Sequence, residues 1–244
     1  MAVIDCFTFF GVNPRRRADW SVAALLRAMQ ENDIDRALTC SLKGVLYDFT
    51  EGNEETLATC AGDRRLVPVG TIDPRRALGC EEQVVRLAGR GCRAFRFFPN
   101  EQGWPFDFLP FLRVVARIEE ADGVVFVPCK ASGAATELLR LLGGRALAVV
   151  LCEVGYWNFA EVLACGREAP RFHLETHLLD TPEALEMAAE VYGEGRLLLG
   201  SNAPETTPGP AIAMVRASRL SEPGKAGVLG GNVARLLGMQ NAAD

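Results

Sequence analysis

Eight short apolar segments rich in β-branched residues recur along the chain, and each is followed by a turn and a stretch with helical periodicity. The segments are almost continuously hydrophobic, which is typical of parallel strands covered on both faces. They occupy residues 2–7, 35–41, 65–72, 92–98, 123–129, 147–153, 171–177 and 196–202. Helical periodicity is clearest over residues 21–32, 81–90, 108–121, 135–142, 158–167 and 182–193.

The repeat of strand and helix determines the predicted architecture. Each unit spans about 30 residues, the size of one βα unit, and glycines end most of the helical stretches. Eight such units in series favour a closed barrel. An open doubly wound sheet is the alternative, but no G-x-G-x-x-G follows any predicted strand. We therefore predict an α/β protein with a single (β/α)8 TIM-barrel domain over residues 1–244.

Composition excludes several classes of partner. The net charge is −5, and the only basic cluster is Arg15–Arg17, so nucleic acid is not expected. No apolar run approaches the roughly 20 residues that span a bilayer, so we expect no membrane partner. The N-terminal segment has no basic region or small-residue cleavage site, which predicts a cytoplasmic protein. The eight cysteines form no C-x-x-C pair and are expected to be buried thiols.

Several stretches at the predicted strand ends carry a family resemblance. They read IDCFTFFG (4–11), GCRAFRFFPN (91–100), VVLCEVG (149–155), RLLLGSNAP (196–204) and GNVARLLGM (231–239). In this order they resemble stretches of the amidohydrolase superfamily, in the branch related to decarboxylases and lactonases. The resemblance runs almost the full length of the chain. It implies a TIM barrel and, in the family, a divalent metal that acidifies water and polarises a carbonyl or carboxylate.

The chain departs from the family at the metal ligands that the resemblance implies. The two first-strand histidines correspond to Phe7 and Phe9, and the fifth-strand histidine to Pro128. Glu153 replaces the sixth-strand histidine, and Asn202 replaces the eighth-strand aspartate. A phenylalanine ring offers no lone pair, and asparagine lacks the charge of aspartate. We therefore expect no cofactor, neither the zinc of the family nor another divalent metal.

The remaining polar residues at the strand ends can form a pocket for an organic ligand. Glu153 and His177 are candidate acid–base residues, and Lys130 is a candidate Schiff-base amine if it is desolvated. The planar fork of Arg96 suits a substrate carboxylate. The full substrate-binding set is predicted to be Arg96, Asn202, Glu175, Phe7 and Phe9. Alternatively, Arg96 and Glu153 form an internal salt bridge that fills the cavity.

Three functions follow from these residues. The main hypothesis is a non-catalytic, regulatory or partner-binding pseudoenzyme, either a homo-oligomer or a hetero-oligomer with an active paralogue. The alternative is a metal-independent hydrolase or lyase that acts on a small carboxylate or lactone. A second alternative is a metal-dependent hydrolase with an atypical site. Cys129, Glu153, Glu175 and His177 lie near strand ends and would be its donors.

Overall fold

The computed structural model describes residues 2–14, 16–76 and 78–239. Arg15 of the basic cluster and the two ends of the predicted domain lie outside the described residues. Eight parallel strands form one sheet in the order β1 to β8, so every strand pairs with its neighbour in sequence. The strands are β1 (Ile4–Phe10), β2 (Arg36–Ser41), β3 (Leu66–Thr71), β4 (Ala94–Arg96), β5 (Val124–Pro128), β6 (Ala148–Cys152), β7 (Phe172–Glu175) and β8 (Leu197–Leu198).

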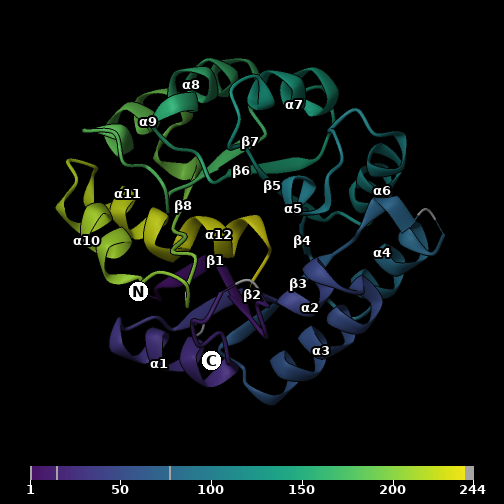
Figure 1. Cartoon of the computed structure of the whole chain (residues 1–244). Coiled ribbons are helices and arrows are strands. Elements are labelled where there is room, and N and C mark those ends of the chain that lie inside the picture. Colours follow the sequence, from purple (N-terminus) through teal and green to yellow (C-terminus); the bar gives the residue numbers. More distant parts are fainter. Residues whose placement is uncertain (1, 15, 77, 240–244) are drawn as a thin grey trace.

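The sheet curls into a nearly closed barrel, with its strands at the centre of the molecule (Figure 1). The segment after β8 meets β1, because the Cys6 amide donates to the Leu199 carbonyl at 2.8 Å. Further along, the Phe9 amide donates to the Ala203 carbonyl at 2.9 Å. The predicted single (β/α)8 barrel is therefore confirmed. Each predicted apolar segment overlaps one strand, although β1 continues to Phe10, past the end of the segment predicted over residues 2–7.

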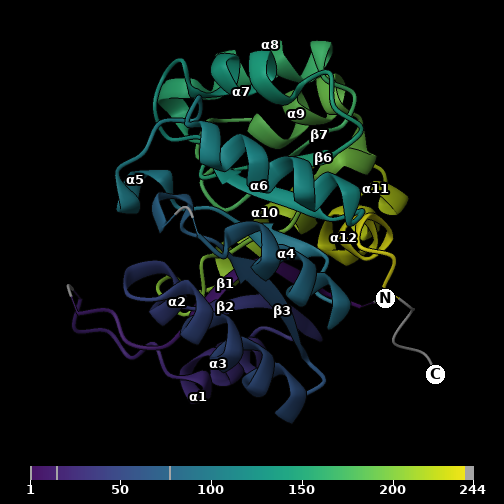
Figure 2. The same cartoon turned by 90° about the vertical axis from the view of Figure 1, so that its right-hand side faces the viewer.

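Helices surround the strands and cover the outer face of the barrel (Figures 1 and 2). They are α1 (Val22–Glu31), α2 (Leu42–Leu46), α3 (Phe49–Gly62), α4 (Cys80–Gly89), α5 (Pro99–Gln102), α6 (Leu109–Glu120), α7 (Ala134–Leu142), α8 (Phe159–Glu168), α9 (Ala184–Tyr192), α10 (Gly209–Ala217), α11 (Glu222–Ala226) and α12 (Asn232–Leu236). Short 3₁₀ turns lie at Pro74–Arg76, Tyr156–Asn158 and Glu194–Arg196, and a π-helical turn lies at Gly227–Gly231. None of the described helices is long and apolar enough to cross a membrane.

Two hydrophobic clusters hold these layers together. The larger one lies between the strands and the surrounding helices, and the smaller one includes Cys6, Leu38 and Phe126. An irregularity in the pairing of β1 with β2 falls between Asp5 and Thr8. A bulge of this kind changes the direction in which the following side chains point. Phe7, within this irregular stretch, and Phe9, just after it, belong to the smaller cluster, at the end of the barrel where the strands finish.

Candidate functional site

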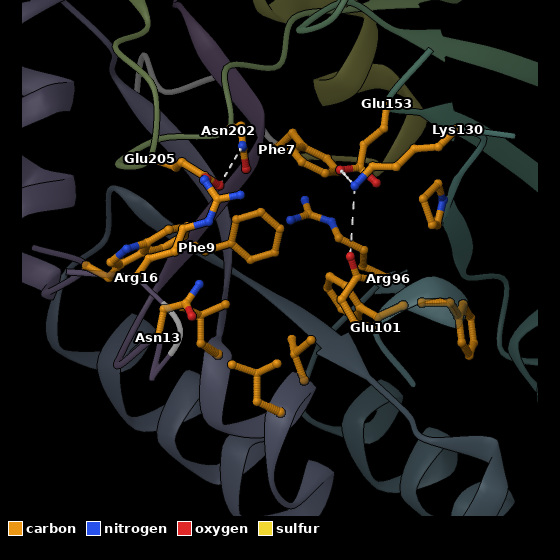
Figure 3. A pocket seen from close by; sticks show the side chains of 17 residues that line it. Phe7, Phe9, Asn13, Arg16, Arg96, Glu101, Lys130, Glu153, Asn202 and Glu205 are labelled. Carbon is orange, nitrogen blue, oxygen red and sulfur yellow. Dashed lines mark hydrogen bonds and ion pairs between the residues drawn. The ribbon is translucent and has the colours of Figure 1, made fainter. Parts of the chain in front are cut away.

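A cavity of about 240 Å³ opens at the carboxyl ends of the strands, the end of a TIM barrel where active sites lie. Its walls include six residues predicted from the sequence (Figure 3): Phe7, Phe9, Arg96, Lys130, Glu153 and Asn202. The loop after β1 contributes Arg16 of the basic cluster and Trp20, neither of which was among the predicted site residues. Glu175 and His177, the other two predicted residues, do not line this cavity.

Arg96, the last residue of β4, forms a rigid part of the cavity wall and is only 1% exposed. Its Nη1 donates to the Thr8 carbonyl at 3.1 Å, and its Nη2 donates to the Cys6 carbonyl at 2.6 Å. The guanidinium carbon also lies 4.2 Å from the centre of the Phe7 ring and 4.9 Å from that of Phe9. Stacking of this kind favours a cation, so the two phenylalanines hold Arg96 in place while leaving it charged.

The charge of Arg96 has no direct anionic partner in the part of the chain that the structure describes. Among the described residues no carboxylate forms an ion pair with it, and its buried Nε has no hydrogen-bond partner. The predicted salt bridge between Arg96 and Glu153 is therefore wrong, because Glu153 pairs with Lys130 instead. A buried cation is costly unless an anion accompanies it. The second N–H of each Nη atom stays available to a ligand, since only one acceptor engages each.

Lys130 and Glu153 form an ion pair at the mouth of the cavity, with 2.8 Å between Nζ and Oε1. Lys130 also lies 3.9 Å from Glu101. Its side chain is 45% exposed, so the desolvation that a Schiff-base amine requires is absent. Burial raises the pKa of Glu153 above its ordinary value, although Lys130 acts in the opposite direction. The pair is therefore suited to binding a carboxylate and exchanging a proton beside it.

Two residues at strand ends adopt left-handed backbone conformations. Glu153 has a φ of 58° and Asn202 a φ of 63°. Asparagine tolerates this region, but glutamate does so at a cost, and such conformations concentrate at functional sites. Asn202 donates to Glu205 at 3.1 Å, and Glu205 pairs with Arg16. These contacts close the side of the cavity opposite Lys130 (Figure 3).

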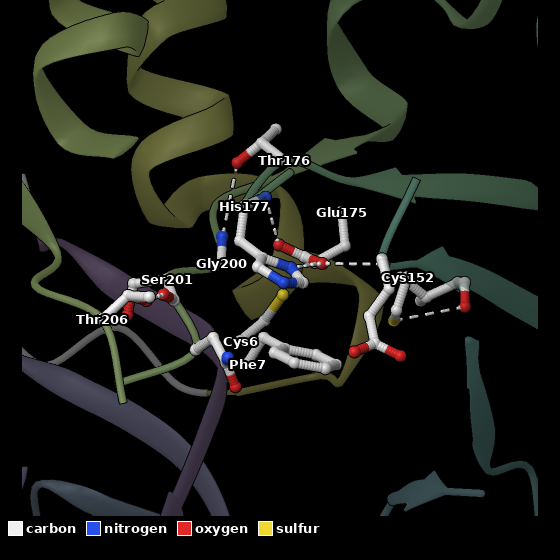
Figure 4. Close-up of polar contacts among 12 residues, drawn as sticks. Cys6, Phe7, Cys152, Glu175, Thr176, His177, Gly200, Ser201 and Thr206 are labelled. Atoms are coloured by element: carbon white, nitrogen blue, oxygen red, sulfur yellow. Dashed lines mark hydrogen bonds and ion pairs between the residues drawn. The ribbon is translucent and has the colours of Figure 1, made fainter. Parts of the chain in front are cut away.

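Glu175 and His177 form a buried pair next to Phe7 (Figure 4). Glu175 accepts hydrogen bonds from the His177 amide and faces Nδ1 of the ring, both at 2.6 Å. The imidazole stacks on the Phe7 ring with 4.8 Å between centroids. Burial alone would lower the pKa of His177, but the Glu175 carboxylate raises it on balance. The pair packs against Phe7 but does not itself line the cavity.

Asp5 is a further buried carboxyl group that the sequence analysis did not identify. It accepts hydrogen bonds from the amides of Phe7 at 3.0 Å and Ser201 at 3.1 Å, and from the Ser201 hydroxyl. Burial raises its pKa to about 6. The aspartate joins the bulge in β1 to the segment after β8, so it fixes the position of Phe7 in the wall.

The fold and the site match a known family. A family model described as amidohydrolase matches residues 10–239, so the chain belongs to the amidohydrolase family. The chain has no match among curated proteins.

Several solved structures share the fold at low sequence identity. A 5-carboxyvanillate decarboxylase from Sphingomonas paucimobilis is 17% identical with a TM-score of 0.77, and the match covers 98% of this chain and 99% of that one. A dihydroxybenzoic acid decarboxylase from Polaromonas sp. JS666 is 14% identical with a TM-score of 0.76, covering 99% and 98%. A probable 2-pyrone-4,6-dicarboxylic acid hydrolase from Acinetobacter baumannii is 14% identical with a TM-score of 0.70, covering 98% and 100%.

The similar structures correct the prediction about the cofactor. We expected neither zinc nor another divalent metal, and this expectation is contradicted. The Polaromonas decarboxylase was crystallised with bound manganese, as was a 5-carboxyvanillate decarboxylase from Novosphingobium aromaticivorans. These structures point to a divalent metal cofactor in the family.

A divalent ion needs several nitrogen, oxygen or sulfur donors around one point. Within the described ranges, no group of three or more histidine, cysteine, aspartate or glutamate side chains is placed to hold a metal. Glu153 is paired with Lys130, and Glu175 is paired with His177. The described arrangement therefore does not fit a divalent ion.

Proposed function

We propose that this chain is an enzyme that removes the carboxyl group of a small carboxylate bound in the cavity at the barrel mouth. The observation that carries the proposal is Arg96, a guanidinium that is buried, rigidly held and without a carboxylate partner among the described residues. A carboxylate ligand would supply the missing negative charge and accept the remaining N–H groups. The cavity is smaller than the roughly 300–1,000 Å³ of sites for drug-sized ligands, which favours a small substrate.

Lys130 and Glu153 complete the chemistry. Lys130 is a further cation at the cavity and attracts the substrate carboxylate. Loss of carbon dioxide breaks the bond between the carboxyl carbon and its neighbour, and the electron pair of that bond must then take up a proton. Glu153 is the proposed donor, since burial raises its pKa and keeps it closer to the protonated form. Its unfavourable backbone conformation is a further reason to assign it a functional role.

The similar structures favour catalysis over the non-catalytic hypothesis. Most of these structures are decarboxylases of ring carboxylates, and one was solved with 2,6-dihydroxybenzoate bound. The proposed decarboxylation is a carboxy-lyase reaction, and the named enzymes among these structures are carboxy-lyases and hydrolases. The predicted oligomer, of this chain alone or with an active paralogue, stays a prediction that light scattering of the purified protein tests.

The proposal is tested with purified protein and a panel of acids, assayed with and without added manganese because similar enzymes hold it. The panel contains benzoate, 2,6-dihydroxybenzoate and 5-carboxyvanillate. We expect at least one acid to bind and to release carbon dioxide. Arg96→Gln should weaken binding of that acid at least about 10-fold, because a charge-assisted pair is lost. Binding and turnover absent for every acid would contradict the proposal.

Hydrolysis of a lactone is the second candidate. The observation in its favour is the similar hydrolase from Acinetobacter baumannii, which was crystallised with citric acid. In that reaction Glu153 would act as a base toward water instead of as an acid toward carbon. Ring opening of 2-pyrone-4,6-dicarboxylate without release of carbon dioxide would support this candidate over decarboxylation.

A further inference from the structure

We infer that Trp20 determines substrate specificity by donating a hydrogen bond from its indole N–H to a second oxygen of the substrate, one outside the reacting carboxylate. The inference rests on the proposed function, because it concerns the substrate of the same cavity. Trp20 lies in the loop between β1 and α1, and its carbonyl accepts a hydrogen bond from the Gly11 amide at 2.7 Å. The tryptophan is therefore anchored at the barrel mouth.

The indole N–H of Trp20 has no acceptor among the described residues. The residue is only 4% exposed and lines the cavity, and its buried Nε1 has no hydrogen-bond partner within that part of the chain. Buried indole N–H groups nearly always have a partner, because losing the bond to water is unfavourable. Because Trp20 lines the cavity, we infer that a bound ligand brings this acceptor.

The surrounding walls explain why the protein does not supply this acceptor. Trp20 belongs to a hydrophobic cluster with Phe9, Leu42, Val45 and Phe98, whose side chains accept no hydrogen bond. The three carboxylates that line the cavity are engaged elsewhere, in ion pairs with cations: Glu101 and Glu153 with Lys130, and Glu205 with Arg16. A ligand oxygen is the acceptor that this arrangement leaves room for.

The order of the strands in the barrel places the second oxygen of the substrate away from its reacting carboxylate. β1 and β5 lie four strands apart in an eight-stranded barrel, and therefore on opposite sides of it. Trp20 follows β1, whereas Lys130 follows β5. Figure 3 accordingly places Arg16, from the loop that carries Trp20, across the cavity from Lys130. A substrate whose carboxylate lies between Arg96 and Lys130 would need another oxygen to reach Trp20.

Indole N–H signals in NMR spectra test this directly, since the chain has three tryptophans in three different settings. Trp104 already donates to Gln102 at 2.9 Å, and Trp157 is 86% exposed, so both serve as internal controls. Protein labelled with ¹⁵N at tryptophan is titrated with 2,6-dihydroxybenzoate and with benzoate, and Trp20→Phe assigns the signal. We expect the dihydroxy acid to move the Trp20 proton downfield. Benzoate should move it little, and the two control signals should stay in place.

Affinities provide the second arm. Trp20→Phe keeps an aromatic ring and removes the donor, so it should weaken binding of 2,6-dihydroxybenzoate roughly 10-fold while changing that of benzoate little. Trp157→Phe is the matched control and should change neither affinity. Equal weakening of both acids, or binding that leaves the Trp20 signal unmoved, would overturn the inference and leave the proposed function standing. Failure of wild-type protein to bind either acid would count against both.

Discussion

The ammonium of Lys130 lies 2.8 Å from Oε1 of Glu153, which joins the ends of the neighbouring strands β5 and β6 at the mouth of the cavity. Two opposing effects act on this carboxyl group. Burial raises the pKa of Glu153, and the cation beside it lowers that pKa, with burial the larger of the two. The contact therefore adjusts how readily Glu153 gives up a proton.

Removing the cation should change the pH dependence of the reaction. In Lys130→Met the pKa of Glu153 should rise further, so the pH above which kcat/KM declines moves upward. Substrate affinity should fall by roughly 10-fold, because a charge that attracts the carboxylate is lost. Lys43→Met is the control, since Lys43 is equally exposed and forms a similar pair with Glu51 away from this cavity. An unchanged pH profile in Lys130→Met would mean that the contact between Lys130 and Glu153 plays no part in catalysis.

Arg96→Lys tests whether a planar guanidinium is required. Lysine keeps the charge, but its single nitrogen cannot occupy the positions of both Nη atoms that bond the carbonyls of Thr8 and Cys6, so the planar fork is lost. We expect the free energy of unfolding to fall by about 1–3 kcal/mol, because buried acceptors lose their donors. Affinity for the carboxylate should fall at least about 10-fold. Both changes are measurable, by urea denaturation and by calorimetric titration.

Arg196→Lys is the matched control for that variant. Arg196 also donates to several carbonyls, among them Ala169 at 2.9 Å and Tyr192, but it does not line the cavity. In Arg196→Lys the free energy of unfolding should fall, and the affinity for the carboxylate should stay unchanged. Equal loss of affinity in both variants would mean that Arg96 acts only by holding the barrel together.

Asp5 should make stability depend on pH. Its pKa is raised from 3.8 to about 6 by burial, so between these values the folded protein holds a proton that the unfolded chain has released. The free energy of unfolding should therefore fall as pH rises through this range, by on the order of 3 kcal/mol from this group. Urea denaturation of wild type and Asp5→Asn from pH 4 to 7 isolates the effect. If the free energies of unfolding of the two proteins differed by the same amount at pH 4 and at pH 7, this prediction would be contradicted.

Much of the fold could be predicted from the sequence, because parallel strands covered on both faces read as continuous apolar runs. Helix α3 (Phe49–Gly62) was not among the clearest helical stretches, since glycine, asparagine and threonine interrupt its apolar periodicity. Its buried face includes polar residues such as Asn53, whose side chain bonds the main chain of Thr71 at 2.8 and 3.0 Å. Tertiary contacts of this kind leave little trace in a hydrophobic pattern.

The site was predictable where it depends on strand ends and less so where it depends on loops. Arg96, Lys130 and Glu153 line one cavity because parallel strands end at the same rim. The pairing of Glu153 was predicted wrongly, since its left-handed backbone is set by tertiary structure and its side chain reaches Lys130. Trp20 was missed because it lies on a loop, whose path no periodicity encodes.

Decarboxylation in deuterated water is the most direct test of the central claim. Wild-type protein is incubated with the acid of the panel that it binds, and the product is observed by NMR. We predict a product that carries one deuterium on the carbon that lost the carboxyl group. Glu153→Gln should form it about 10²–10⁴-fold more slowly while binding the acid as before, because a proton donor is lost. No product, or an equal rate in Glu153→Gln, would contradict the account.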